Sequence, residues 1–184
     1  MAVPPEIKTE RLLVLPFGEE HLTERYVGWL NDKDVVRYSE QRHKAHTLES
    51  CLLYRESFDD SPGYFWAIEE TQIGLGHIGN ITAQIDSNNS IADIGILLGE
   101  KDAWGQGYGF EAFSSVSDFL LLDVGIRKVT CGTTENNLPM LGIMKKMNMV
   151  PDGRRKRQYV LEGKEVDVVY MALYRQKPVG ENRA

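Results

Sequence analysis

Residues 104–112 hold the strongest structural signal in this chain, three glycines that alternate over five positions in Trp-Gly-Gln-Gly-Tyr-Gly-Phe-Glu-Ala. The apolar run 91–98 before them predicts a buried strand, and Phe113, Val116 and Leu120 after them recur at helical spacing. Glycine lets the backbone turn tightly and lets a ligand approach without meeting a Cβ atom. The first turn of a helix directs free N–H groups at one point, where anions bind. The stretch therefore predicts a phosphate site between a strand and a helix.

Two common nucleotide-binding loops do not fit these residues. A Walker-type phosphate loop needs Lys and then Ser or Thr after its last glycine, but Tyr108 follows Gly107. A dinucleotide loop that started at Gly105 would need a third glycine where the chain has Phe110. Residue identity therefore argues against a nucleotide-phosphate binder.

The glycine-rich stretch resembles the pyrophosphate loop of the GNAT superfamily of acyl-CoA-dependent N-acyltransferases, Gln/Arg-x-x-Gly-x-Gly/Ala. In this chain the motif spans Trp104 to Gly109, and Trp104 departs from it because Gln or Arg is usual at the first position. Thr-Glu-Arg-Leu at 9–12 and Trp-Leu-Asn-Asp at 29–32 resemble the ribosomal-protein N-terminal acetyltransferase-like branch. The resemblance covers nearly the whole chain, from 9 to 174.

The resemblance implies an N-acetyltransferase that moves an acetyl group from acetyl-CoA to a primary amine by direct transfer in a ternary complex. A protein N-terminus, an amino sugar and another small amine stay open as acceptors. It also implies an α+β fold of three layers, a GNAT-like mixed and mostly antiparallel central sheet of about seven strands flanked by helices. In such a fold two parallel strands, here 91–98 and 127–132, splay apart, and the acyl-CoA arm fills the gap.

Periodicity and turn residues predict the elements in order. The expected strands are 9–16, 64–69, 73–81, 91–98, 127–132, 158–161 and 165–174. The expected helices are 19–30, 48–58, one that follows the glycines and one that is capped by Asn137. A helix between 91–98 and 127–132 makes a right-handed crossover, so these two strands should be parallel. No repeat or linker interrupts the chain, so we expect a single domain over 1–184 with a core at about 9–175 and a tail at 176–184.

By the resemblance, the cofactor site takes residues from the end of the central strand, the loop and a later helix. These residues are Leu97, Leu98, Trp104, Gly105, Gln106, Gly107, Tyr108, Gly109 and Asn137. Main-chain groups of Leu97 and Leu98 would line the pantetheine arm and the acetyl carbonyl, where an N–H group can stabilise the oxyanion. The side chain of Asn137 would bind the pantetheine arm.

A general base would help the transfer, because an alkyl amine with a pKa of about 10 is mostly protonated at neutral pH. Three residues are candidate bases: Asp93 at the start of the central strand, His77 on the preceding strand, and Glu100. Each also has an ordinary structural interpretation. Glu111 lies in the first turn of the helix after the glycines, and we interpret it as compensating the helix dipole.

The helix that follows Asn137 lacks the hydroxyl groups that many superfamily members place there. The positions three and seven residues later hold Met140 and Met144, and a thioether cannot protonate a departing thiolate. Both methionines share helical spacing with Ile143 and Met147, so we predict that they belong to the core. The missing hydroxyls leave a non-catalytic acyl-CoA-binding module as the alternative function.

Two polar segments lie outside the cofactor motif. Residues 34–47 bring two of the four histidines together with Glu40 and Arg42, and the resemblance assigns this region to the acceptor site. A solvated connector fits the same residues equally well. The basic run 154–157 is expected to precede a strand as a solvated flank of a hairpin, and contact with an anionic acceptor or a CoA phosphate is the alternative.

Composition and charge exclude several classes of protein. A net charge of −6 over 184 residues argues against a general nucleic-acid binder, and the apolar run 119–122 is too short to cross a membrane. Cys51 and Cys131 stand far apart, which indicates neither a disulfide framework nor a metal site and fits a reducing cytosol. The first six residues do not form a signal peptide. We therefore expect a cytoplasmic protein without a metal, with acetyl-CoA and an amine as partners, and a homodimer stays open.

Overall fold

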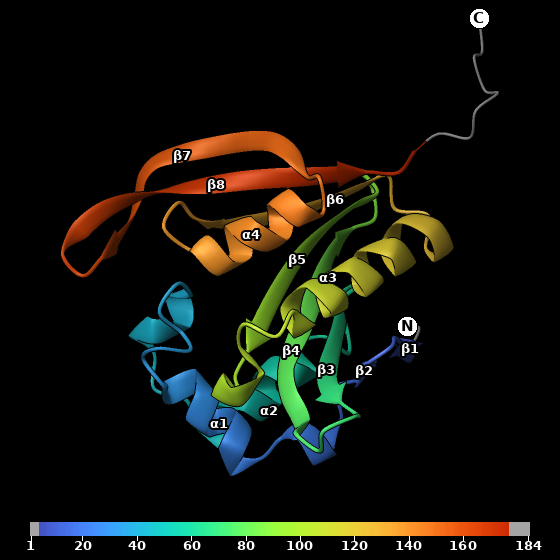
Figure 1. Ribbon diagram of the computed structural model, residues 1–184, viewed down its shortest axis with the longest axis vertical. Helices are drawn as coiled ribbons and strands as arrows, with labels where there is room; N and C mark the ends of the chain where they lie inside the picture. Colours follow the sequence, from blue (N-terminus) through green and yellow to red (C-terminus); the bar gives the residue numbers. More distant parts are fainter. Residues whose placement is uncertain (1–3, 177–184) are drawn as a thin grey trace, which may run out of the picture.

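The computed structural model describes residues 4–176 and builds them around one eight-stranded sheet (Figure 1). The strands are β1 (Ile7–Lys8), β2 (Leu12–Pro16), β3 (Tyr64–Glu70), β4 (Gly76–Asp86), β5 (Ile91–Leu98), β6 (Lys128–Thr134), β7 (Val150–Leu161) and β8 (Lys164–Tyr174). The α-helices are α1 (Glu24–Asn31), α2 (Leu48–Glu56), α3 (Tyr108–Asp118) and α4 (Leu138–Lys146). Short 3₁₀ or π turns cover Glu19–His21, Glu40–His43, Lys101–Ala103 and Phe119–Asp123.

The sheet has the strand order β1-β2-β3-β4-β5-β6-β8-β7, and its neighbouring strands are antiparallel except for the parallel pair β5 and β6. The expected α+β class with a mixed, mostly antiparallel sheet is therefore confirmed. The sheet has eight strands rather than about seven because the two-residue β1 pairs with β2 at the edge. The parallel pair agrees with the right-handed crossover expected from the helix between its strands.

Strands β5 and β6 pair over only a short stretch. Ile91–Asp93 of β5 lies opposite Lys128–Thr130 of β6, although β5 continues to Leu98 and β6 to Thr134. The two strands therefore diverge after Asp93 and Thr130, and a V-shaped gap opens between them (Figure 1). This divergence confirms the splay that the family resemblance implied.

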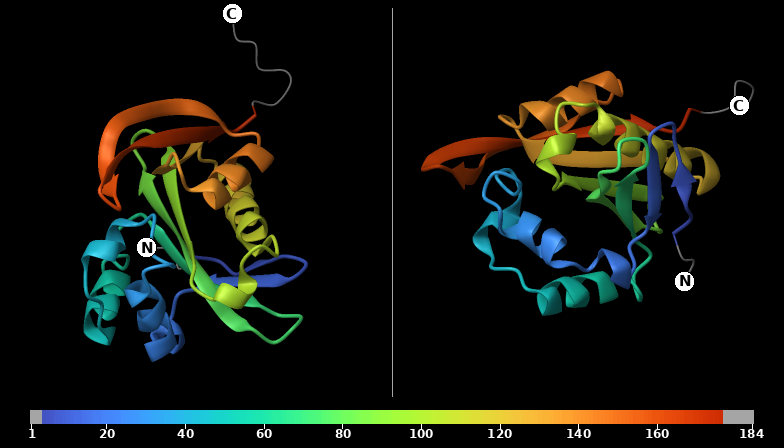
Figure 2. Two further views of the ribbon diagram at one scale, coloured as in Figure 1. Left: turned by 60° about the vertical axis from the view of Figure 1, so that its left-hand side comes forward. Right: turned by 60° about the horizontal axis from the view of Figure 1, so that its bottom comes forward.

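Helices cover both faces of the sheet. Figure 2 shows α3 and α4 on one face and α1 and α2 on the other. Because side chains alternate along a strand, Trp66 and Ile68 of β3 join the core beneath α3, while Phe65 and Ala67 join a second core with α1. On β5 the same alternation directs Leu97 toward α1 and its neighbours toward α3.

Two predicted element boundaries are wrong for local reasons. The expected helix 19–30 is split, because Thr23 accepts a hydrogen bond from the Tyr26 N–H at 3.2 Å and starts α1 anew. The expected strand 73–81 begins only at Gly76. The buried Glu70 carboxylate accepts hydrogen bonds from the backbone N–H groups of Gln72, Ile73 and Leu75, and these bonds fold residues 71–75 into a turn.

The basic run Arg154–Arg157 was expected to precede a strand, but it lies inside β7. Three residues of β7, 156–158, bulge out opposite Asp167 of β8, so the register jumps between Arg155 and Tyr159. The Asp167 carboxylate accepts a 2.8 Å bond from the Arg157 N–H and a 2.7 Å bond from the Arg154 guanidinium. Arg154 and Arg157 therefore support the bulge, and the guanidinium groups of both pair with acidic side chains.

The expected cap of α4 is confirmed, because the Asn137 side chain accepts a hydrogen bond from its first turn. Asn148, after the last turn, adopts a left-handed conformation with φ of 55°. None of the helices in residues 4–176 combines the length and the apolar character that a membrane span requires. The first three residues and most of the expected tail, from 177 onward, lie outside the described residues.

Candidate active site

The glycine-rich loop joins β5 to α3 with two residues in a left-handed conformation. Gly105 has a φ of 74° and Gly107 a φ of 87°, which residues with a Cβ atom rarely adopt. Gly107 is the N-cap of α3, and it offers no side chain to satisfy the first N–H groups of the helix. These groups are free to bind an anion, as the sequence predicts.

Gly109 serves a different purpose from the two glycines before it. A Cβ atom at this position would lie 3.2 Å from Cδ1 of Ile143 and 3.3 Å from Cδ1 of Leu98. The absence of a side chain lets α3 start close to both α4 and the end of β5. The loop is thereby held directly above the gap between β5 and β6.

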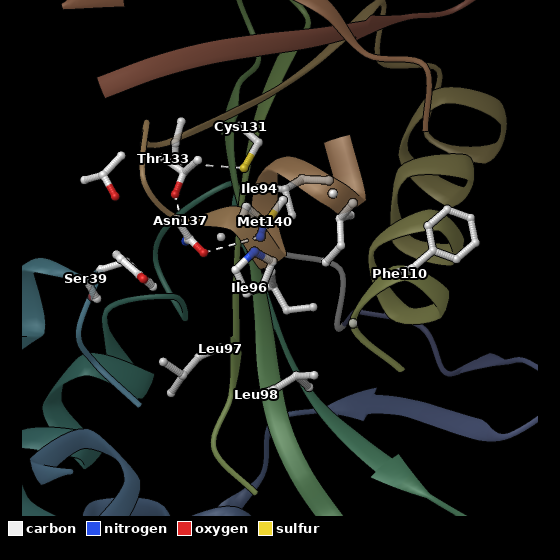
Figure 3. A pocket seen from close by; sticks show the side chains of 18 of the residues that line it. Ser39, Ile94, Ile96, Leu97, Leu98, Phe110, Cys131, Thr133, Asn137 and Met140 are labelled. Carbon is white, nitrogen blue, oxygen red and sulfur yellow. Dashed lines mark hydrogen bonds between the residues drawn. The ribbon is translucent and has the colours of Figure 1, made fainter. Parts of the chain in front are cut away.

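A cavity of about 890 Å³ runs from this loop through the gap to the face that carries α1. Figure 3 shows its centre, with Asn137 and Met140 of the α4 region on one side and Ser39 of the α1–α2 connection opposite. Its far wall comes from the β7–β8 hairpin through Tyr159 and Tyr170. The cavity therefore opens toward both faces of the sheet, as a site for two substrates requires.

Seven of the nine predicted cofactor residues line this cavity. They are Leu97, Leu98, Trp104, Gly105, Gly107, Gly109 and Asn137. Gln106 lines a smaller neighbouring hollow instead, where its carbonyl oxygen accepts a bond from Arg11. Tyr108 is only 3 % exposed and packs in the core, so it supports the loop from below.

Trp104, which departs from the family motif, ties the loop to the strand before it. Its indole N–H donates a 2.9 Å hydrogen bond to the Leu98 carbonyl oxygen, while its ring stays 42 % exposed at the cavity edge. The residue thus fixes where β5 ends and where the loop begins.

The edge of β5 that faces the gap is a second source of hydrogen bonds. Within residues 4–176, no strand pairs with this edge from Ile94 to Leu98, because β6 has already turned away. Its backbone N–H and C=O groups can therefore pair with an extended amide-containing ligand, as an added strand would. A pantetheine arm has this chemistry.

Asn137 links α4 to β6 at the edge of the cavity. Its side-chain oxygen accepts a 3.3 Å bond from the Met140 N–H, and its NH₂ group donates a 2.9 Å bond to Oγ1 of Thr133 on β6 (Figure 3). The NH₂ group keeps one further hydrogen for a ligand. Asn137 therefore caps α4 and still presents a donor to the cavity.

The side of α4 that faces the cavity carries Asn137, Met140, Ile143 and Lys146, and none of these has a hydroxyl group. Met144 does not line the cavity, because it is 1 % exposed and belongs to the core. The prediction that Met140 and Met144 are core residues is confirmed, although Met140 also borders the cavity.

Asp93 lies where β5 and β6 diverge, on the face that carries α1. Its Oδ2 accepts a 2.7 Å hydrogen bond from the Thr130 hydroxyl. The surrounding protein raises the pKa of Asp93 by desolvation, and the bond from Thr130 opposes this only in part. The side chain remains accessible from the cavity, so its carboxylate can meet a ligand there.

His77 and Glu100 do not line the cavity. His77 packs against the rings of His21 and Trp29, and its burial and the neighbouring His21 lower its pKa to about 4. Glu100 pairs with the Arg25 guanidinium, which holds the pKa of this carboxyl below its usual value. The geometry gives support to Asp93 alone among the three candidate bases.

Several cavity residues had no clear signal in the sequence. Tyr170 crosses over Gly132, where an added Cβ atom would lie 2.7 Å from the tyrosine ring. Tyr159 reaches the same wall through the bulge in β7. Both depend on β8 lying between β6 and β7, an order that periodicity does not reveal. Among residues 4–176, no group of three or more His, Cys, Asp or Glu is arranged to hold a metal ion.

Three solved structures of similar fold are remote from this chain in sequence. An acetyltransferase of the GNAT family from Bacillus anthracis superposes with a TM-score of 0.78 at 20 % identity, covering 94 % of this chain and 100 % of that one. A spermidine N-acetyltransferase from Vibrio cholerae, in complex with CoA and spermine, superposes with a TM-score of 0.79 at 15 % identity. The match covers 91 % of this chain and 97 % of that one. RimL, a ribosomal L7/L12 alpha-N-protein acetyltransferase in complex with CoA, superposes with a TM-score of 0.79 at 16 % identity. The match covers 92 % of this chain and 98 % of that one.

The family model described as "Acetyltransferase (GNAT) domain" matches residues 11–150, which is well over half of the chain. The matched stretch contains the glycine-rich loop, the diverging strands and α4. The chain therefore belongs to the GNAT acetyltransferases, which are acetyl-CoA-dependent acyltransferases.

Proposed function

We propose that this enzyme transfers the acetyl group of acetyl-CoA directly to a primary amine while both substrates are bound. The observation that carries the proposal is the cavity that crosses the sheet between β5 and β6. The glycine-rich loop lies at one end and the α1–α2 connection at the other. Two substrates that enter from opposite faces would meet inside the gap.

Three groups of this chain would hold acetyl-CoA. The N–H groups that start α3 and the loop at Gly105 and Gly107 would bind the pyrophosphate. The unpaired edge of β5 would pair with the pantetheine amides, and a backbone N–H near Leu97 would stabilise the oxyanion formed from the thioester. The remaining hydrogen of the Asn137 NH₂ group would bind a pantetheine carbonyl.

Asp93 is the group that we assign to the amine. An ammonium ion that enters from the α1 face would meet its carboxylate at the point where the gap closes. The carboxylate would first attract the cation and then accept its proton through bridging water molecules, because Asp93 lies four residues before Leu97 on the extended β5. The raised pKa of Asp93 supports this role, because a base for an amine must bind a proton more readily than a surface carboxylate does.

The chain opening gives a reason to test protein N-termini first among the acceptors. Thr-Glu-Arg-Leu at 9–12 and Trp-Leu-Asn-Asp at 29–32 resemble the ribosomal-protein N-terminal acetyltransferase-like branch, and RimL, of similar fold, acts on an N-terminus. The spermidine N-acetyltransferase has a comparable fold, so polyamines belong in the same screen beside amino sugars. Release of free CoA on mixing each amine with acetyl-CoA measures the transfer.

The loop assignment has a matched pair of variants. Gly107→Val and Gly74→Val both place a branched side chain at a φ above 80°, so both carry similar backbone strain. Only Gly107 lies in the cofactor loop, whereas Gly74 lies in the turn before β4. We expect calorimetry to show at least tenfold weaker acetyl-CoA binding for Gly107→Val and near wild-type binding for Gly74→Val. Equal affinities of the two folded variants would remove the loop from the cofactor site.

A further inference from the structure

Thr9, Arg11 and Glu111 form a hydrogen-bonded cluster that joins the start of the chain to α3. The Thr9 hydroxyl donates a 2.6 Å bond to Glu111 Oε1, which also accepts a 2.9 Å bond from the Arg11 backbone N–H. The Arg11 guanidinium donates to Glu111 Oε2 through Nε and Nη2, both at 2.7 Å. Within residues 4–176, the hydrogen bonds that this carboxylate accepts come from residues about one hundred positions away in sequence.

The same guanidinium also holds the glycine-rich loop. Its Nη1 donates a 2.9 Å bond to the Gln106 carbonyl oxygen, and its carbon lies 4.5 Å from the centre of the Tyr108 ring. A Cβ atom added to Gly107 would lie 3.5 Å from Nη2. Arg11 therefore contacts Gln106 and Tyr108 and lies beside Gly107 between them. It does so next to Gly107, whose left-handed conformation the loop requires.

Glu111 makes this contact important for an anionic ligand. It lies in the first turn of α3, the turn whose N–H groups would bind the pyrophosphate. An unpaired carboxylate there would repel that ligand. Burial opposes the ionisation of Glu111, but the hydrogen bonds from Thr9 and Arg11 outweigh it and hold its pKa below the usual value. The carboxylate is therefore charged, and Arg11 is the cation that neutralises it.

We propose that Thr9, Arg11 and Glu111 act as a positioning clamp that sets the affinity of the loop for acetyl-CoA. Arg11 holds the backbone at Gln106 and cancels the charge of Glu111, which would otherwise repel the pyrophosphate. The inference rests on the proposed role of the loop in cofactor binding. The clamp does not touch the acceptor end of the cavity, so it acts on acetyl-CoA affinity and not on the rate of transfer in the complete complex.

Calorimetry with acetyl-CoA tests the clamp in four proteins: wild type, Arg11→Met, Glu111→Gln and the double variant. We expect Arg11→Met to bind acetyl-CoA at least tenfold more weakly and to raise its KM equally, with kcat at saturation within about twofold. The double variant should recover at least threefold of that loss, because it removes the uncompensated carboxylate. Arg55→Met is the matched control, since Arg55 pairs with Asp59 at 2.8 Å and is 33 % exposed, against 2.7 Å and 30 % for Arg11.

Thermal unfolding of each variant separates this pattern from a loss of stability, because removing the uncompensated Glu111 carboxylate would also restore stability. Binding is therefore compared only among variants that are folded at the assay temperature. Arg11→Met affinity within twofold of wild type, or a double variant as weak as Arg11→Met, would overturn the clamp. If Arg11→Met does not fold, Arg11→Lys replaces it, because lysine keeps the charge but cannot reach Glu111 and Gln106 together. A threefold loss then supports the clamp, and an unchanged affinity overturns it. Failure of the loop assignment itself is distinguishable, since Gly107→Val would then bind acetyl-CoA as Gly74→Val does.

Discussion

At the residue scale, the proposed chemistry of the site depends on one carboxylate, that of Asp93, at the apex of the gap. Asp93 shares its environment with Thr130 across the last paired position of β5 and β6. The pairing fixes both side chains on the same face, so the hydroxyl orients the carboxylate toward the cavity. The proposed base is thereby held where β5 and β6 are still paired.

We expect Asp93→Asn to lower kcat/KM by roughly 10²–10⁴, the usual contribution of a general base. In wild type the profile of kcat/KM against pH should fall on the acid side as Asp93 becomes protonated, and in the variant this limb should disappear. Asp118→Asn is the matched control, because burial also raises the pKa of Asp118 but its side chain does not line the cavity. An acid limb that persists in Asp93→Asn would assign the base to another group.

The same variant has a second readout in stability. Because the folded protein raises the pKa of Asp93, ionisation of this carboxyl disfavours folding at neutral pH. Asp93→Asn should therefore be more stable than wild type at neutral pH. The difference should shrink as the pH falls through the folded pKa and vanish below the unfolded value of about 3.9, where both states are protonated. A variant that is less stable at neutral pH would contradict this sign.

At the element scale, α4 shows why spacing along a helix does not alone identify a catalytic residue. The seventh residue after Asn137 is Met144, and the helical turn carries it onto the core side, away from the cavity. The residues that do face the cavity are Met140, Ile143 and Lys146. The helix thus supplies packing and a cap, and any proton for the departing thiolate comes from elsewhere. Tyr159 and Tyr170 carry hydroxyl groups on the opposite wall.

We expect Met144→Leu to leave kcat within about tenfold, because it conserves volume in the core and removes no proton donor. Met144→Tyr should lower the unfolding free energy by about 1–3 kcal/mol through overpacking, since Met144 has almost no exposed surface. Thermal unfolding and steady-state kinetics measure the two effects. A stable Met144→Tyr protein with a raised kcat would show that this position reaches the thiolate after all.

At the scale of the whole molecule, the sequence predicts those features that depend on neighbouring residues along the chain. Apolar runs predict most of the strands, and the alternating glycines predict the loop, because each of these patterns lies within a few consecutive residues. The turn at Glu70 and the bulge at Asp167 were missed, since each depends on a side chain that folds a neighbouring segment. The strand order β6-β8-β7 was not predicted either, and neither was the position of Tyr170, which depends on it. A cavity wall that is built from several separate elements can be predicted only when the order of the strands in the sheet is known.

The cavity itself also bears on the kinetic mechanism. Cys131 lines the gap, but burial raises the pKa of its thiol, and the nearby Asp93 carboxylate raises it further. Cys51 lies on the buried side of α2, where burial likewise raises the pKa of its thiol, and it does not line the cavity. A neutral thiol is a poor nucleophile, because the thiolate is the reactive form. Neither cysteine is therefore expected to carry the acetyl group, which supports the proposal that both substrates are bound at once.

We accordingly expect the double variant Cys51→Ala/Cys131→Ala to keep kcat within about threefold, and initial velocities at varied acetyl-CoA and amine to give intersecting reciprocal plots. Each substitution leaves a small buried space, so a modest fall in melting temperature is the physical cost. Thermal unfolding of the variant separates that cost from any effect on turnover. Parallel reciprocal plots would mean that the acetyl group rests on the protein between substrates. Loss of turnover in a folded Cys131→Ala variant would then identify the thiol in the gap as its carrier, and the two open ends of the cavity would serve successive substrates instead of simultaneous ones.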